Sequence, residues 1–142
     1  RARRRRVILV DSSAWVEFDR ATDSAVDRAL TQLIATGGPI AVTEPVVMEV
    51  CAGARNHRRE RELRRLLDRF QLARFDAAAD FNAAVTIYRT CRRAGVTPRG
   101  LVACLIAAVT LRGGHEVLAK DRDLANVARV VGLRLHSASL GA

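Results

Sequence analysis

The chain has 142 residues, of which 49% are hydrophobic and 27% charged, a composition that suits one domain with a buried core. No apolar run approaches the roughly 20 residues that span a bilayer, and the basic start leads into only four apolar residues before Asp11, so we expect neither a membrane helix nor a secretory signal. The formal net charge is +9, and five of these charges belong to arginines within residues 1–6. We therefore expect a cytoplasmic protein, and the excess of arginine favours a polyanionic partner such as nucleic acid over solubility alone.

Short apolar runs alternate with helical patterns along the chain. The first run, residues 7–10, is rich in β-branched residues, as expected of a strand buried on both faces. Next come a helix from Ser12 or Ser13 toward Arg20, a helix over 25–36, a strand over 40–42 and a helix that opens at Thr43 or Glu44. The remaining predicted elements are a helix over 58–69, a strand over 71–75, helices over 77–94 and 98–112, a strand over 116–119, a helix over 121–131 and a strand over 133–136. This alternation predicts an α/β layered domain with a mostly parallel central sheet flanked by helices.

The three cysteines are Cys51, Cys91 and Cys104. They are odd in number and lack the CxxC spacing of zinc and redox sites. We therefore predict small buried apolar residues rather than disulfides or metal ligands.

Acidic residues recur just beyond the predicted strands. Asp11 follows the first strand, Asp121 and Asp123 follow the strand over 116–119, and Glu49 lies on the helix after the second strand. Ligands of open parallel sheets bind beyond the carboxyl ends of the strands. Carboxylates that converge there repel one another, and a hard divalent cation such as Mg²⁺ relieves that repulsion. The alternative is that the aspartates only cap the helices that follow them.

Four segments appear in a fixed order: VILVDSSAW, TEPVVMEVCAGAR, TPRGLVACLIAA and VLAKDRDLANVA. They resemble the four blocks of the PIN-domain toxins called VapC, over about residues 7–136. The resemblance implies a single PIN domain over residues 7–142, preceded by a basic extension over residues 1–6. It also implies a magnesium-dependent endoribonuclease, with Mn²⁺ as the alternative ion, that is held inactive by a cognate VapB-type antitoxin and is typically a homodimer.

The same resemblance assigns site residues. The first acid of the family corresponds to Asp11, the second to Glu49 and the last pair to Asp121 and Asp123. All four are expected to be catalytic, and the first three are expected to bind the metal. Ser13 matches the hydroxyl residue that supports the first acid.

One position departs from the family pattern, because Ala103 stands where the third block carries a metal-binding aspartate. Helical spacing predicts a stripe that borders an open cleft, formed by Arg99, Ala103, Ala107, Thr110 and Gly114. The large residues expected to face the core are Leu101, Val102, Leu105 and Ile106. We therefore expect a folded chain that is inactive or attenuated as a nuclease. The alternative is a catalytically silent module that binds RNA or a regulatory partner.

Two further expectations concern partners. Arg99 and Arg122 are the leading candidates to contact the phosphates of RNA. An antitoxin helix or tail is expected to lie in an apolar groove, walled by Trp15, Val16, Phe18 and the helix over 45–54. Ordinary core packing of these apolar residues is the alternative.

Overall fold

The computed structural model describes residues 6–142, so the predicted basic extension lies outside the described residues except for Arg6. Four short strands form one sheet in the order β3-β2-β1-β4, and every neighbouring pair is parallel. The strands are β1 (Ile8–Val10), β2 (Ile40–Val42), β3 (Gln71–Leu72) and β4 (Glu116–Leu118). Every residue of β1 and β2 is buried, which explains why both appear in the sequence as unbroken apolar runs.

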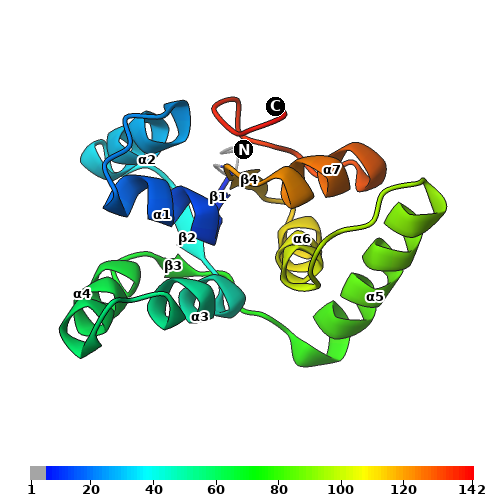
Figure 1. Cartoon of the computed structure of the whole chain (residues 1–142), viewed down its shortest axis with the longest axis horizontal. Helices are drawn as coiled ribbons and strands as arrows, with labels where there is room; N and C mark the ends of the chain where they lie inside the picture. The colour runs from blue at the N-terminus through cyan, green and yellow to red at the C-terminus, as the bar shows by residue number, and fades with distance from the viewer. Residues whose placement is uncertain (1–5) are drawn as a thin grey trace, which may run out of the picture.

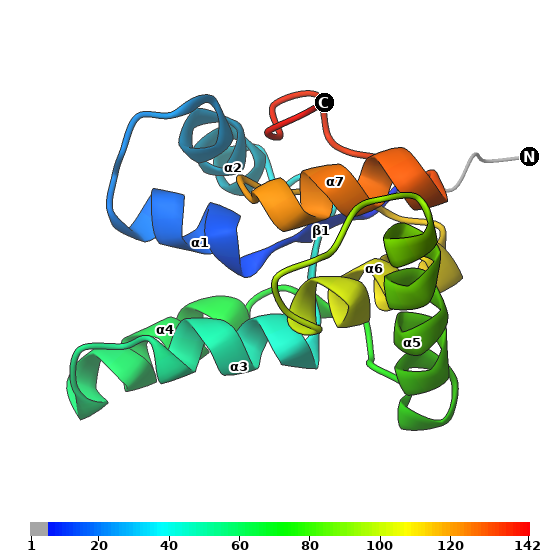
Figure 2. The ribbon, with the colours of Figure 1, turned by 45° about the vertical axis from the view of Figure 1, so that its right-hand side comes forward.

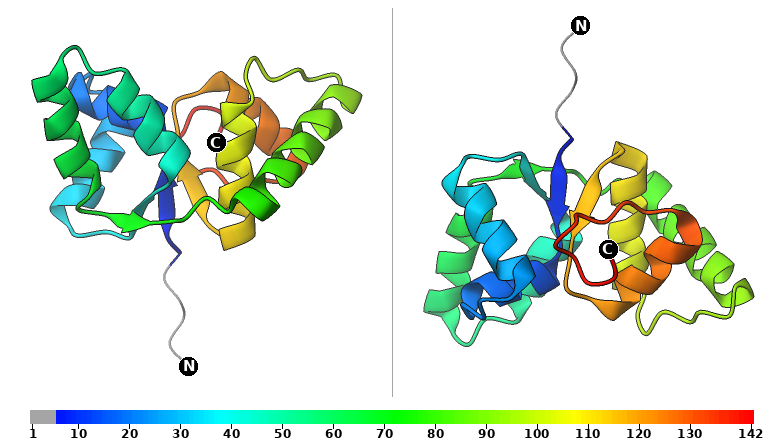
Figure 3. Two further views of the ribbon diagram at one scale, coloured as in Figure 1. Left: turned by 90° about the horizontal axis from the view of Figure 1, so that it is seen from below. Right: turned by 90° about the horizontal axis from the view of Figure 1, so that it is seen from above.

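Seven helices of the described chain surround this sheet (Figure 1). They are α1 (Ser12–Asp19), α2 (Ala25–Ala35), α3 (Glu44–Ala52), α4 (His57–Leu67), α5 (Ala77–Arg93), α6 (Val102–Gly113) and α7 (Arg122–Val131). Figure 3 shows α1 to α4 gathered on one side of β1 and α5 to α7 on the other. The predicted α/β class with a parallel central sheet is therefore confirmed.

Three predicted elements are shorter than expected. The helix predicted from residue 98 begins only at Val102, because the backbone N–H of Arg99 is taken by the side chain of Asp123 and Leu101 offers no capping side chain. The strand predicted over 71–75 ends at Leu72, and the N–H of Phe75 binds the Glu44 carboxylate instead of a neighbouring strand. The strand predicted over 133–136 is reduced to a single bridge between Val117 and Leu135.

The core contains apolar side chains from both groups of helices. The Trp15 ring packs against Phe70, with ring centroids 5.4 Å apart, and meets Phe18 edge-on at 6.1 Å. The three cysteines are buried and free, as predicted. No helix within residues 6–142 has the length and apolar character needed to cross a bilayer.

A buried ion pair fastens α5 to the end of α6. Asp80 is 1% exposed and receives two hydrogen bonds from Arg112, from Nε at 2.9 Å and from Nη2 at 2.8 Å. The second Asp80 oxygen also accepts the backbone N–H of Asp76 at 2.8 Å, and Arg112 donates to the carbonyl of Arg74. This network joins the start of α5, the segment before it and the last turn of α6.

Candidate active site

The acidic residues predicted from the sequence line one pocket of about 540 Å³, beyond the carboxyl ends of β1 and β4. Asp11, Glu49, Asp121 and Asp123 all border it, and so does Ala103. These side chains come from four separate parts of the chain, so the parallel sheet brings them to one edge.

Asp11 is the most deeply buried of these acids, at 3% exposure. It caps α1 and accepts hydrogen bonds from the backbone N–H and the hydroxyl of Ser13, at 3.0 and 2.5 Å. The Ser13 hydroxyl oxygen also accepts the backbone N–H of Lys120 at 2.9 Å, so it ties the loop after β1 to the loop after β4. Burial raises the pKa of Asp11 from 3.8 to about 6, against the lowering effect of Ser13, and repulsion from Asp121 and Glu49 adds to the rise.

Asp11→Asn is expected to stabilise the metal-free protein at pH 7.5 by about 1–3 kcal/mol. Because the pKa of folded Asp11 lies above that of the unfolded chain, ionisation costs stability as the pH rises from about 4 to about 6, and that cost stays above pH 6. Asparagine caps a helix as well as aspartate does and removes the charge. Urea unfolding in EDTA at pH 7.5 and pH 4 checks this, since the advantage of the variant should vanish at the lower pH. Equal stability at pH 7.5 would contradict it.

The other three acids also accept a hydrogen bond from the protein. Glu49 is exposed and accepts the Ser12 hydroxyl at 2.7 Å. Asp121 caps α7 by accepting the N–H of Leu124 at 3.0 Å. Asp123 accepts the backbone N–H of Arg99 at the same distance. The capping interpretation is therefore right for Asp11 and Asp121, and it does not exclude a second role in the pocket.

The pocket offers oxygen donors only, which is the chemistry that magnesium prefers. Within residues 6–142 no group of three or more acidic, histidine or cysteine side chains is arranged to hold a metal ion, so the sharing of one cation by the four carboxylates stays a prediction. Each carboxylate accepts a hydrogen bond from its own donor, and position 103 supplies no oxygen. The donors that line the pocket fit a divalent cation in kind.

The surroundings of Ala103 differ from the predicted stripe. Ala103 is half-buried and lines the pocket with Val102 and Ile106, two residues that were expected to face only the core. Ala107 and Thr110, predicted at the cleft, are fully buried, whereas Leu101 is 59% exposed. The reason is that α6 packs against α3, α5 and α7, so its small side chains allow close approach of other helices rather than bordering solvent.

Two charged residues of the pocket were missed by the sequence reasoning, Glu17 and Lys120. The Lys120 ammonium donates to the Glu17 carboxylate at 3.0 Å, and this bond lowers the pKa of Glu17. A signal for both was present, since Glu17 lies one helical turn beyond Ser13 and Lys120 directly precedes Asp121.

Arg99 and Arg122 are exposed beside the pocket rather than on its wall, next to Gly100 and Asp121, which do line it.

A second cavity of about 570 Å³ adjoins the acidic pocket, because Val16 and Glu49 line both. Trp15, Val50 and Ala54 also border it, so a groove lies between α1 and the second half of α3 where it was predicted. It is not purely apolar, because charged side chains also line it: Asp19, Arg20, Arg55 and Arg59. Phe18 does not border it and packs against Trp15 instead, as the core-packing alternative held.

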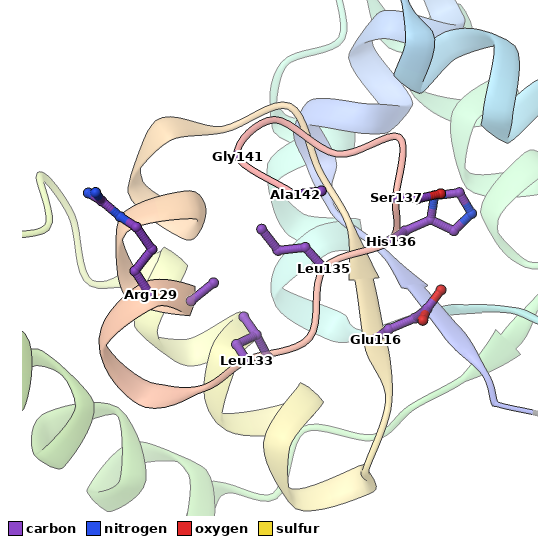
Figure 4. Close-up of a pocket in the computed structure, with 9 residues that line it drawn as sticks. Glu116, Arg129, Leu133, Leu135, His136, Ser137, Gly141 and Ala142 are labelled. Carbon is purple, nitrogen blue, oxygen red and sulfur yellow. The ribbon is translucent and has the colours of Figure 1, made fainter.

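Figure 4 shows a third hollow, of about 560 Å³, between α7 and the segment that follows it. Leu133 and Leu135 lie on its floor, and Glu116 is the only acidic side chain of its lining. None of the site residues predicted from the sequence belongs to this hollow.

The model of the PIN domain family matches residues 8–130, the stretch that contains the parallel sheet and the acidic pocket at its edge. Ribonuclease VapC11 of Mycobacterium tuberculosis is 39% identical over 132 residues, which cover 92% of this chain and 98% of that protein. The chain therefore belongs to the PIN domain family and, within it, to the VapC ribonucleases, as the resemblance of its four segments predicted.

Solved structures share the fold at much lower sequence identity. VapBC2 from Rickettsia felis, bound to a DNA fragment from its promoter, has a TM-score of 0.71 and 16% identity, and covers 94% of this chain and 98% of its own. A toxin–antitoxin complex from Klebsiella pneumoniae has a TM-score of 0.64 and 16% identity, with coverages of 94% and 95%. The fold is thus shared over nearly the whole chain.

Proposed function

We propose that the protein is the ribonuclease toxin of a toxin–antitoxin pair, that its cleavage of RNA depends on Mg²⁺ or Mn²⁺, and that the chain as given cleaves poorly because of Ala103. The observation that carries the proposal is the gathering of Asp11, Glu49, Asp121 and Asp123 around one pocket, in a member of the VapC ribonucleases. No other residue type in that pocket is a better candidate for hydrolytic chemistry, since it holds no histidine or cysteine.

Asp11, Glu49 and Asp121 would hold the cation, with Asp123 at the same pocket. When bound, a divalent ion supplies an activated water and neutralises charge on the phosphate. Asp11 has most to gain from such an ion, because its buried charge is poorly solvated and repelled by its neighbours. Ser13 fixes the orientation of the Asp11 carboxylate, and the Lys120 ammonium at the same pocket is positioned to attract a phosphate oxygen.

A catalytically silent module that binds RNA or a regulatory partner is the second candidate, and the missing acid at position 103 favours it. The two functions are separated by one experiment. RNA cleavage is measured with magnesium and with EDTA, for the chain as given and for Ala103→Asp. Cleavage that appears in the variant and disappears in EDTA supports the nuclease.

The partner proposed for the groove between α1 and α3 is a small antitoxin, since a neighbour in fold is a toxin–antitoxin complex. The groove runs into the acidic pocket, so a bound tail could reach the carboxylates with a basic side chain.

Val16→Glu is expected to weaken the complex with a VapB-type antitoxin by about tenfold or more, because it removes an apolar contact from the groove wall and adds a negative charge there. Val85→Glu on α5 is the matched control, since Val85 is also exposed and lies outside the groove. Isothermal titration of the purified proteins measures both. Equal binding by Val16→Glu and the parent would remove the groove as the docking site.

A further inference from the structure

The stretch from residue 81 to residue 115 contains five arginines and no aspartate or glutamate. One of the five, Arg112, is neutralised by the buried Asp80. The other four, Arg89, Arg92, Arg93 and Arg99, are exposed and form no ion pair within residues 6–142. These four arginines therefore keep their positive charge, and the acid that contacts one of them is Asp123, which binds the backbone N–H of Arg99.

Helix α4 pairs three of its five arginines, whereas Arg61 and Arg65 have no ion pair in the described structure. On α4, Arg58 pairs with Glu62, and Arg64 pairs with Glu60. Arg59 pairs with both Asp19 and Glu62. On α5 the corresponding partners are missing. Favourable interaction with the carbonyl end of the helix accounts for Arg92 and Arg93 in the last turn, but it does not account for Arg89 or for the lack of any acid nearby.

Three of these arginines converge on one side of α5. Arg89, Arg92 and Arg93 are three and four residues apart, a spacing that places them on a common helix face, and they line a shallow hollow of about 320 Å³. Among residues 6–142, the only polar contact of Arg93 with another side chain is a long one to the Thr90 hydroxyl at 3.5 Å. Three guanidinium groups are thus free to bind an anion.

The positive surface leads to the acidic pocket. Figure 2 shows the chain leaving the end of α5 and crossing to the start of α6, where Gly100 lines the pocket. Arg99 in this crossing is anchored by its backbone to Asp123, so its position beside the pocket is fixed. A phosphodiester chain that enters a pocket of carboxylates is repelled by them, and free arginines along its path would offset that repulsion.

We propose that Arg89, Arg92 and Arg93 bind the phosphate backbone of the RNA substrate on one side of the cleaved bond, with Arg99 between them and the pocket. The inference rests on the proposed ribonuclease function and adds a second contact region for the substrate. Guanidinium contacts to phosphates carry no base information, so this region selects RNA that extends well beyond the pocket rather than a particular sequence.

The test uses the chain as given in EDTA, so that binding is measured without turnover. A labelled single-stranded RNA of about 16 nucleotides and one of about four are titrated over a range of salt concentrations. The triple variant Arg89→Gln, Arg92→Gln, Arg93→Gln is compared with Arg61→Gln, Arg65→Gln, Arg69→Gln. The second set removes the same charge from exposed arginines on or just after α4 that have no ion pair in the described structure.

The α5 variant is expected to bind the long RNA about tenfold or more weakly at low salt, and its plot of log affinity against log salt should be shallower by about 2, at about 0.7 per phosphate contact. The α4 variant should change affinity by about twofold at most. The short RNA should bind the α5 variant and the parent equally. Lysine at the three α5 positions should restore most of the binding, because a point charge is sufficient for a phosphate.

An equal loss in the α4 and α5 variants would overturn the inference, because total charge would then explain the effect. If the α5 variant binds the long RNA as tightly as the parent, the inference is overturned as well. It is also overturned if the α5 variant binds the antitoxin more weakly while its RNA binding is unchanged. The proposed function is judged separately, by magnesium-dependent cleavage of the short RNA in the Ala103→Asp background. That cleavage does not involve α5, whereas a parent chain that binds no RNA at all would contradict both proposals.

Discussion

Replacing Ala103 by aspartate is expected to raise magnesium-dependent cleavage of RNA by about 10²-fold or more. Position 103 lies on the wall of the acidic pocket, which Asp11 also lines, so a carboxylate there would add one more oxygen donor to the pocket. A firmly held ion both activates water and fixes the position of the phosphate, and positioning carries much of phosphoryl-transfer catalysis.

The matched control is Ala103→Asn, which has nearly the same size and no charge. It should recover far less activity than aspartate, because an amide oxygen holds magnesium weakly. Asp11→Asn in the Ala103→Asp background should return cleavage to the level of the chain as given. If Ala103→Asp cleaves a panel of structured RNAs no faster than the parent, the nuclease proposal loses its main support and the silent module becomes the better account.

Arg112→Ala is expected to lower the free energy of unfolding at pH 7 by about 2–3 kcal/mol, because it leaves the carboxylate of Asp80 buried without its partner. Hydrogen bonding from Arg112 holds the pKa of Asp80 below its ordinary value. The stabilisation is therefore present above about pH 4, the ordinary pKa of an aspartate, and is lost as the pH falls through the lower pKa of the folded protein. Urea unfolding at pH 7 measures the loss.

Two control variants test whether the loss of stability in Arg112→Ala comes from the broken ion pair with Asp80. Arg61→Ala on α4 removes an exposed arginine with no ion pair in the described structure and should change stability by less than about 0.5 kcal/mol. The double variant Arg112→Ala, Asp80→Asn should be more stable than Arg112→Ala alone, since no charge is left buried. A loss of similar size in the double variant would assign the effect to lost packing of the arginine stem.

The sequence predicted those parts of the fold that depend on local patterns. Strand β1 could be recognised because an unbroken apolar run rich in β-branched residues is typical of a buried strand. Gly114 could be recognised as a helix end because glycine favours the left-handed backbone conformation, which it adopts with φ 66°. The start of α6 was placed too early because it depends on a contact between Arg99 and Asp123, which lie 24 residues apart. The strand over 133–136 failed for a similar reason, since pairing with β4 is a tertiary property.

The sequence predicted which acidic residues line the candidate site, but not how their side chains are arranged. Residues after parallel strands meet at one edge whatever the details, so the gathering of Asp11 and Asp121 followed from chain order. The orientation of each carboxylate depends on side-chain hydrogen bonds, such as the bond that Ser12 donates to Glu49. The spacing of residues along the sequence does not predict these bonds. The ion pair of Glu17 with Lys120 joins residues 103 positions apart and was missed for the same reason.

Asp11 and Asp121 line the pocket and also cap α1 and α7. Loss of either side chain would therefore lower the stability of the fold more than loss of an acid that caps no helix. Removing either side chain would leave the first turn of α1 or α7 with an unsatisfied backbone N–H. Position 103 is the second residue of α6, whose cap is Leu101, so an aspartate there would not be the helix cap. Of these three places, it is the one where a carboxylate can be lost from the pocket without the loss of a helix cap.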